Sequence, residues 1–134
     1  MTVELWSLVC SGALLFVLIA VAASANMIVK GLAWSAGNRD EAAPSTGWPG
    51  RASRTYHNML ETLPIFIILV LVAQAANIHT ANTALGAQLY LWGRTGYAAL
   101  YYLGIVYVRT LAWLVSIIGM AMLLIEIAKA VPAA

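Results

Sequence analysis

The sequence predicts an all-α membrane protein, a four-transmembrane-helix bundle formed by one domain over residues 1–134. The first observation is composition: 63% of the residues are hydrophobic and 9% are charged, and the mean hydropathy is +0.87. Soluble domains carry about 25% charged residues. The second observation is that four segments each reach the length of about 20 apolar residues that a helix needs to cross a bilayer. Such a chain leaves no room for a separate soluble domain.

We predict helices at about residues 5–29, 55–76, 83–106 and 111–130. The loop between the first two, at about residues 31–53, is long and rich in Gly, Pro and charge. The second connection, near residues 77–80, is short, and the third is a tight turn near residues 107–110. The first segment carries Glu4 rather than a basic residue before an apolar run too long for a signal peptide, so we expect it to be retained.

The basic residues favour one orientation in the membrane. Five of them lie at or near the first and third connections: Lys30, Arg39, Arg51, Arg54 and Arg109. The second connection carries no Lys or Arg. The positive-inside rule therefore places the first and third connections in the cytoplasm and both termini on the non-cytoplasmic side. Lys129, near the C-terminus, is the exception, and its long side chain can extend to the interface.

Several function classes are excluded by composition. The net charge is only +2 and the basic residues form no polybasic run, so we expect no nucleic-acid binding. The single cysteine, Cys10, rules out an internal disulfide and argues against a metal site. The sequence contains no Ser/His/Asp arrangement and no glycine-rich phosphate loop. Any chemistry would therefore depend on a bound cosubstrate that brings its own nucleophile.

A polar stripe marks the start of the second predicted helix. It consists of Arg51, Arg54, Asn58 and Glu61, at offsets of three, four and three residues. These side chains fall within roughly 80° of one helix face. A glutamate one turn into an apolar helix needs a specific partner. The stripe therefore predicts a site, with an ion network inside one helix as the structural alternative.

The third predicted helix carries a matching stripe. Its members are Tyr90, Arg94, Tyr97 and Tyr101, within roughly 60° of one face. An arginine beside several hydroxyl groups suits a carboxylate or a thiolate. Taken singly, the tyrosines also fit an interfacial belt or ordinary packing. We expect Arg94 to face the bundle and to pair with an acid, for which Glu61 is the candidate.

Arg109 and Thr110 open the fourth predicted helix. A guanidinium beside the amides of a helix N-terminus would lower the pKa of a thiol and hold its thiolate. The alternative for Arg109 is an anchor that follows the positive-inside rule. Asn26 and Lys30, one turn apart, are candidates for a polar pocket at the same end, whereas His57 is expected to face a neighbouring helix or lipid headgroups.

The segment from Arg51 to Phe66 resembles the second-helix signature of the membrane-associated proteins in eicosanoid and glutathione metabolism, the MAPEG family. The pattern is an arginine, then Asn58, then Glu61, followed by an apolar run with Pro64 and Phe66. The loop over residues 37–41 is similar to that of the bacterial branch of the family. Length, four predicted spans and the tyrosine series also fit, so the resemblance covers nearly the whole chain.

The resemblance implies a homotrimer that binds glutathione between neighbouring subunits near the cytoplasmic face. It assigns the charged ends of glutathione to one set of residues: Arg51, Arg54, Asn58 and Glu61, with Glu61 taking the amino group. Arg94, Tyr97 and Tyr101 would complete the cradle, and Arg109 would stabilise the thiolate as the catalytic residue. The implied environment is a bacterial inner membrane.

The leading functional hypothesis is therefore a glutathione-dependent membrane transferase, with peroxidase activity as a further possibility, acting on lipophilic electrophiles from the bilayer. One alternative is a protein that keeps the fold and binds glutathione without catalysis. The other is a small four-span transporter that couples protons through a membrane-embedded glutamate. The transporter would need that glutamate deep in the first helix, whereas Glu4 lies at its outer edge.

Overall fold

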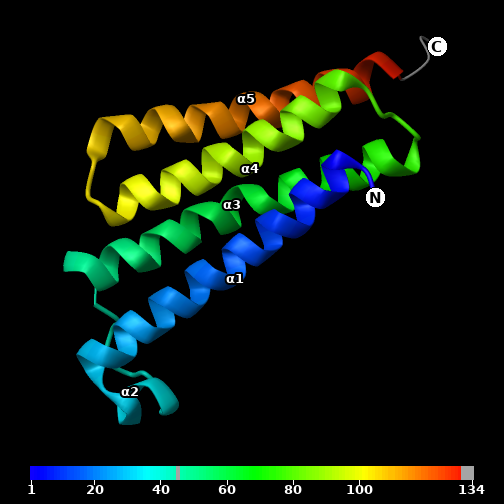
Figure 1. The fold of residues 1–134 in the computed structure, drawn as a ribbon. Helices are drawn as coiled ribbons and strands as arrows, with labels where there is room; N and C mark the ends of the chain where they lie inside the picture. Colours follow the sequence, from blue (N-terminus) through cyan, green and yellow to red (C-terminus); the bar gives the residue numbers. More distant parts are fainter. Residues whose placement is uncertain (45, 131–134) are drawn as a thin grey trace.

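The computed structural model describes residues 1–44 and 46–130, and these residues form an all-helical chain. The helices are α1 (Val3–Lys30), α2 (Leu32–Ala36), α3 (Gly47–Ala75), α4 (Ala81–Tyr102) and α5 (Val106–Ala130). The four long helices run side by side, and the short α2 lies beyond the end of α1 (Figure 1). Helix α4 packs against α5, α3 and α1, and α3 also contacts α1 and α5.

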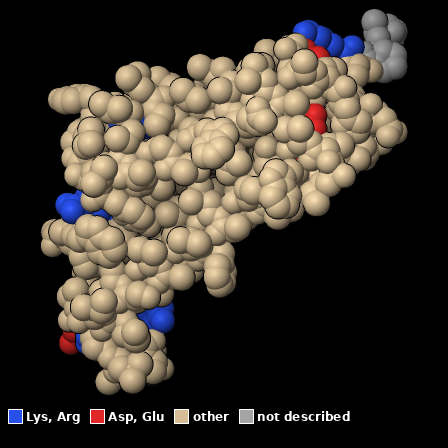
Figure 2. Space-filling view, viewed as in Figure 1, with Lys and Arg blue, Asp and Glu red and all other residues tan. Residues whose placement is uncertain are grey.

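Three of the described helices, α1, α3 and α5, are long and apolar enough to cross a membrane. Helix α4 has 22 residues but carries the buried Arg94 and the tyrosine series, so it is less apolar than the other three. Figure 2 shows charged groups gathered toward the two ends of the visible face, with an uncharged surface between them. This distribution fits a chain embedded in a bilayer. The described structure therefore supports an integral membrane protein.

The helices begin and end at positions that differ from the predicted ones. Helix α3 starts at Gly47 rather than near residue 55, so the stripe from Arg51 to Glu61 lies entirely within a helix. Pro49 lies in its first turn, where a missing N–H costs nothing. The predicted loop at residues 31–53 therefore contains both α2 and the first turns of α3.

The turn between α4 and α5 lies at residues 103–105, not at the predicted 107–110. Gly104 has φ of +77°, a conformation that glycine adopts readily. Arg109 therefore lies inside the first turns of α5 rather than in the connection.

Helices α4 and α5 approach each other through glycine. A Cβ added at Gly93 would lie 2.7 Å from the backbone nitrogen of Ser116, and one at Gly86 would lie 2.7 Å from the carbonyl oxygen of Gly119. Side chains larger than hydrogen cannot fit between backbones this close. The short α4–α5 hairpin therefore forms a closely packed pair against which α3 and α1 lie.

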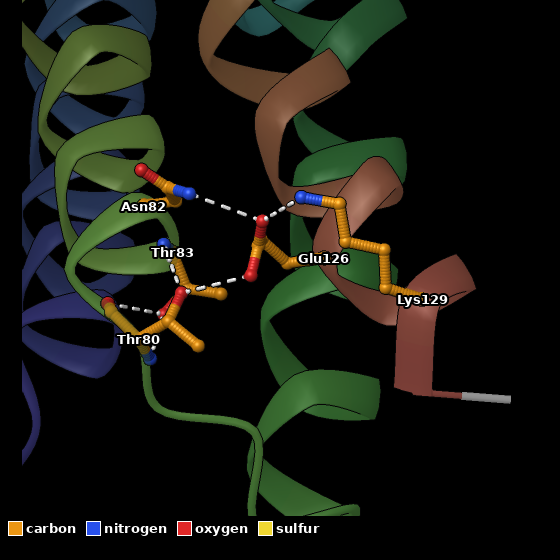
Figure 3. A network of polar contacts seen from close by, with 5 residues as sticks. All are labelled: Thr80, Asn82, Thr83, Glu126 and Lys129. Carbon is orange, nitrogen blue, oxygen red and sulfur yellow. Dashed lines mark hydrogen bonds and ion pairs between the residues drawn. The ribbon is translucent and has the colours of Figure 1, made fainter.

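A polar network fixes the end of the bundle opposite the α4–α5 turn (Figure 3). Thr80 and Thr83 form a capping box at the start of α4. Glu126 of α5 accepts a hydrogen bond from the Thr80 hydroxyl at 3.2 Å and pairs with Lys129 at 2.8 Å. The Thr83 hydroxyl also donates to the buried carboxylate of Glu4 in α1. These contacts join α1, α4 and α5.

We predict that Gly119→Ala lowers the free energy of unfolding by about 1–3 kcal/mol, because overpacking separates α4 from α5. The added Cβ would lie 2.8 Å from the backbone nitrogen of Tyr90 and closer still to the carbonyl oxygen of Gly86. Gly12→Ala is the matched control, since nothing lies within 4 Å of a Cβ at that position of α1. Thermal unfolding in detergent, followed by circular dichroism, measures both variants. Equal stability of the two variants would contradict the close approach.

Candidate functional site

The two polar stripes face each other along a seam, the line of contact between α3 and α4. Arg94 of α4 donates from Nη1 to Oδ1 of Asn58 on α3 at 2.6 Å. Elsewhere along this seam, Arg54 of α3 donates from Nε to the hydroxyl of Tyr101 on α4 at 3.1 Å. Asn58 thus bonds across to the second stripe rather than bridging Arg54 to Glu61 within α3.

Arg94 is the buried centre of this seam, with 1% of its surface exposed. Its Nη2 donates to the Thr62 hydroxyl, and its Cζ lies 5.7 Å from the ring centroids of Tyr90 and Tyr97. Arginine faces over aromatic rings are stabilised by cation–π attraction. Among the described residues, ion pairs join Lys30 to Glu41 and Lys129 to Glu126, and Arg94 forms none with Glu61. The expected pairing with Glu61 is therefore replaced by neutral oxygen acceptors and rings.

A cleft of about 310 Å³ opens beside the seam. It is lined by Asn58 of α3, by Tyr97 and Tyr101 of α4, and by Arg109, Thr110 and Trp113 of α5. The fold thus brings four of the predicted site residues to one cavity from three helices. Among the described residues that line the cleft, Arg109 is the one cationic side chain and none is acidic.

Arg109 enters the cleft from the first turns of α5. Its side chain is half-buried, and its Cζ lies 4.2 Å from the ring centroid of Tyr101. Amide N–H groups in the first turn of a helix lack partners within that helix and carry a positive partial charge. A guanidinium held by an aromatic ring beside this helix terminus suits an anion.

The remaining predicted residues do not line this cleft. Arg51 is half-buried on α3, and its Nε is buried without a hydrogen-bond partner among the described residues. Glu61 is exposed on the same helix, and no ion pair joins it to the described part of the chain. Both residues keep the helical face predicted for them, but neither lines the cavity.

A second cavity, of about 400 Å³, lies at the end of α1 against α2, the following loop and α3. Asn26 lines this cavity, and its Oδ1 is buried without a partner among the described residues. Lys30 instead pairs with Glu41 at 3.1 Å. His57 also lines this cavity and stacks on Tyr56 with ring centroids 4.2 Å apart. The described residues include no group of three or more His, Cys, Asp or Glu placed to hold a metal ion.

Two residues of the site escaped the sequence analysis. Thr62 accepts from Arg94, and Trp113 lines the cleft. Each follows a predicted site residue by four positions, Asn58 and Arg109 respectively, and therefore shares its helix face. This four-residue spacing could have identified Thr62 and Trp113 as site residues, but a threonine or tryptophan in an apolar helix is more commonly a packing residue.

Comparison with known proteins gives one match. The family model described as "MAPEG family" matches residues 3–129, which is nearly the whole chain. No curated protein and no solved structure matches the chain.

We predict that Asn58→Ala lowers the free energy of unfolding by about 1–3 kcal/mol, because the buried Arg94 guanidinium loses an acceptor. Asn82→Ala is the matched control. Asn82 is exposed at the start of α4 and donates to Glu126 at 3.1 Å, so its loss should change stability by less than about 0.5 kcal/mol. Thermal unfolding in detergent compares the two. Similar small effects would show that Arg94 does not depend on Asn58.

Proposed function

Because the chain belongs to the MAPEG family, we propose that it binds glutathione in the cleft between α3, α4 and α5 and transfers its thiolate to lipophilic electrophiles. The observation that supports this most strongly is the convergence of Asn58, Tyr97, Tyr101 and Arg109 on one cavity, whose described lining residues include no acid. Such a cavity in a membrane-embedded chain can hold an anionic cosubstrate while the apolar electrophile arrives through the bilayer.

Charged residues of α3 suit the carboxylates and the amino group of glutathione. Arg51 and Arg54 supply guanidinium groups for its carboxylates, because arginine forms paired hydrogen bonds with a planar anion. Glu61 is the carboxylate available for the amino group, and it is exposed on the same face of α3. Arg94 is buried behind this surface and acts on the ligand through its neighbours rather than by direct contact.

Arg109 is the proposed catalytic residue. A thiol is nucleophilic as the thiolate, and a nearby cation and helix N-terminus lower its pKa. The thiol proton leaves to water. The thiolate sulfur then attacks an electrophilic carbon, the C–S bond forms, and the leaving group departs with its electron pair. With a lipid hydroperoxide, two glutathione molecules would instead be oxidised to the disulfide while the hydroperoxide is reduced to an alcohol and water.

Glu61 supports a homotrimer whose neighbouring subunit completes the site. An ionisable group exposed on a membrane helix is costly unless it meets a partner. A subunit packed against this face of α3 would cover Glu61 and could bring further ligand contacts. Native mass spectrometry of the protein in detergent should therefore show three chains, and a monomer would contradict the assembly.

The proposed setting is a bacterial inner membrane that the chain crosses four times, because α4 spans it in addition to α1, α3 and α5. Helix α4 is enclosed by contacts with α1, α3 and α5, which cover its polar face. The cleft then lies at the cytoplasmic end, and both termini lie on the other side. Labelling of single cysteines introduced in the α3–α4 connection should occur only from the non-cytoplasmic side, whereas cytoplasmic labelling would reverse the orientation.

The direct test is glutathione titration of the purified protein by calorimetry, followed by conjugation of a chromogenic aryl halide. We expect saturable binding and glutathione-dependent product with release of halide. No binding at millimolar glutathione would overturn the proposed function. Binding without conjugation of any electrophile or reduction of hydroperoxide would leave a glutathione-binding protein and contradict the transferase.

We predict that Arg109→Ala slows conjugation at neutral pH by about 100-fold, the usual effect of removing one group that stabilises a developing or bound anion. Loss of the cation raises the pKa of the bound thiol, so less thiolate is present at neutral pH. The difference in conjugation rate between Arg109→Ala and the unmodified protein should shrink as the pH rises above that pKa.

The matched control is Arg39→Ala, which removes an exposed arginine outside the cleft that binds the Ser35 carbonyl oxygen at 3.0 Å. Its pH–rate profile should overlay that of the unmodified protein. An unchanged profile for Arg109→Ala would remove Arg109 from the mechanism.

A further inference from the structure

We infer that Thr62 is a positioning residue. Through Arg94 it orients the Asn58 side chain so that the Asn58 amide nitrogen faces the cleft as a hydrogen-bond donor. The effect on ligand binding rests on the proposed glutathione function, whereas the orientation itself does not.

The chemistry of arginine fixes which end of Asn58 contacts Arg94. A guanidinium has only donors, so the atom 2.6 Å from Arg94 Nη1 is the carbonyl oxygen of the Asn58 side chain. Asn58 also lines the cleft, and the part of its side chain left for a ligand is the NH₂ group. The buried arginine therefore determines the hydrogen-bonding character of a cleft residue on another helix.

Thr62 in turn anchors Arg94. The Thr62 hydroxyl accepts from Arg94 Nη2, and it lies 3.2 Å from the hydroxyl of Tyr90. Tyr90 is itself fully buried and stacks on Phe66, with ring centroids 3.9 Å apart. Nε of Arg94 has no partner among the described residues, so the two Nη contacts and the rings of Tyr90 and Tyr97 hold the guanidinium in place. Thr62 is one of these two contacts, and it belongs to a rigid, buried group.

The resulting cleft presents donors to its ligand. Arg109 contributes a guanidinium, and the Tyr101 oxygen accepts from Arg54, which leaves its O–H free to donate. The fixed Asn58 amide adds two N–H groups. Without the Thr62 anchor, Arg94 can turn and Asn58 can rotate to place its carbonyl oxygen toward the ligand. That oxygen would repel an anion, so the orientation selects for an anionic ligand group such as a carboxylate or thiolate.

The test uses Thr62→Val, which replaces the hydroxyl by a methyl group of similar size, and Thr62→Ser, which restores the hydroxyl. Thr55→Val is the matched control, because Thr55 is another buried threonine of α3, and within the described structure its hydroxyl donates to the carbonyl oxygen of Arg51 in the same helix and to no other helix. Binding is measured with glutathione, and conjugation is measured with an aryl halide.

We expect Thr62→Val to weaken glutathione binding by about tenfold, a typical result of disturbing one hydrogen bond to a charged group. KM for glutathione should rise in parallel, while kcat at saturation stays within about twofold, since the chemical step at Arg109 is untouched. Thr62→Ser should restore binding, and Thr55→Val should bind like the unmodified protein. Unchanged binding in Thr62→Val, or an equal loss in Thr55→Val, would overturn the inference.

The orientation of the Asn58 side chain can also be measured by NMR without ligand, so its test does not require that the unmodified protein bind glutathione. In protein labelled with ¹⁵N-asparagine, the side-chain amide signal of Asn58 is the one lost in Asn58→Asp. Thr62→Val should shift this signal, whereas Thr62→Ser and Thr55→Val should leave it close to its original position. An unshifted signal in Thr62→Val would show that Thr62 does not orient Asn58. Absence of glutathione binding in the unmodified protein would instead count against the proposed function.

Discussion

The burial of the Arg94 guanidinium in an apolar bundle is the constraint on which the rest of the site depends. A buried cation without partners is strongly destabilising. Here its charge is met by the Asn58 and Thr62 oxygens and by two tyrosine rings rather than by a carboxylate. These contacts require α3 and α4 to pack in one register. That register also brings Asn58 beside the Tyr101 and Arg109 side chains.

The same arrangement keeps the Arg94 charge away from lipid, because only 1% of its surface is exposed. Its Nη1 donates to the Asn58 side chain that lines the cleft, and Arg109 reaches the same cleft from the start of α5. Close glycine contacts hold α5 against α4, and the polar network around Glu126 fixes their far ends. The cleft therefore lies beside a hairpin whose two helices are held together at several points.

The sequence predicted the helical class, the membrane character and the two stripes, because apolar length and helical spacing can be read directly. It also predicted that Arg94 faces inward. It did not predict the Thr62 contact, since a hydroxyl in an apolar run carries no signal about which neighbour it meets. Helix α3 begins before the predicted start because glycine and proline near residues 47–50 are accommodated in a first helical turn. The spacing of Glu61 along α3 predicted its helix face but not which residues it contacts.

The most direct measurement is a solved structure of the protein in a lipid bilayer with glutathione bound. The predicted result places the ligand in the cleft lined by α3, α4 and α5, with the sulfur against Arg109 and an anionic oxygen accepting from the Asn58 amide. Glutathione bound away from this cleft, or an Asn58 side chain turned with its oxygen toward the ligand, would contradict it.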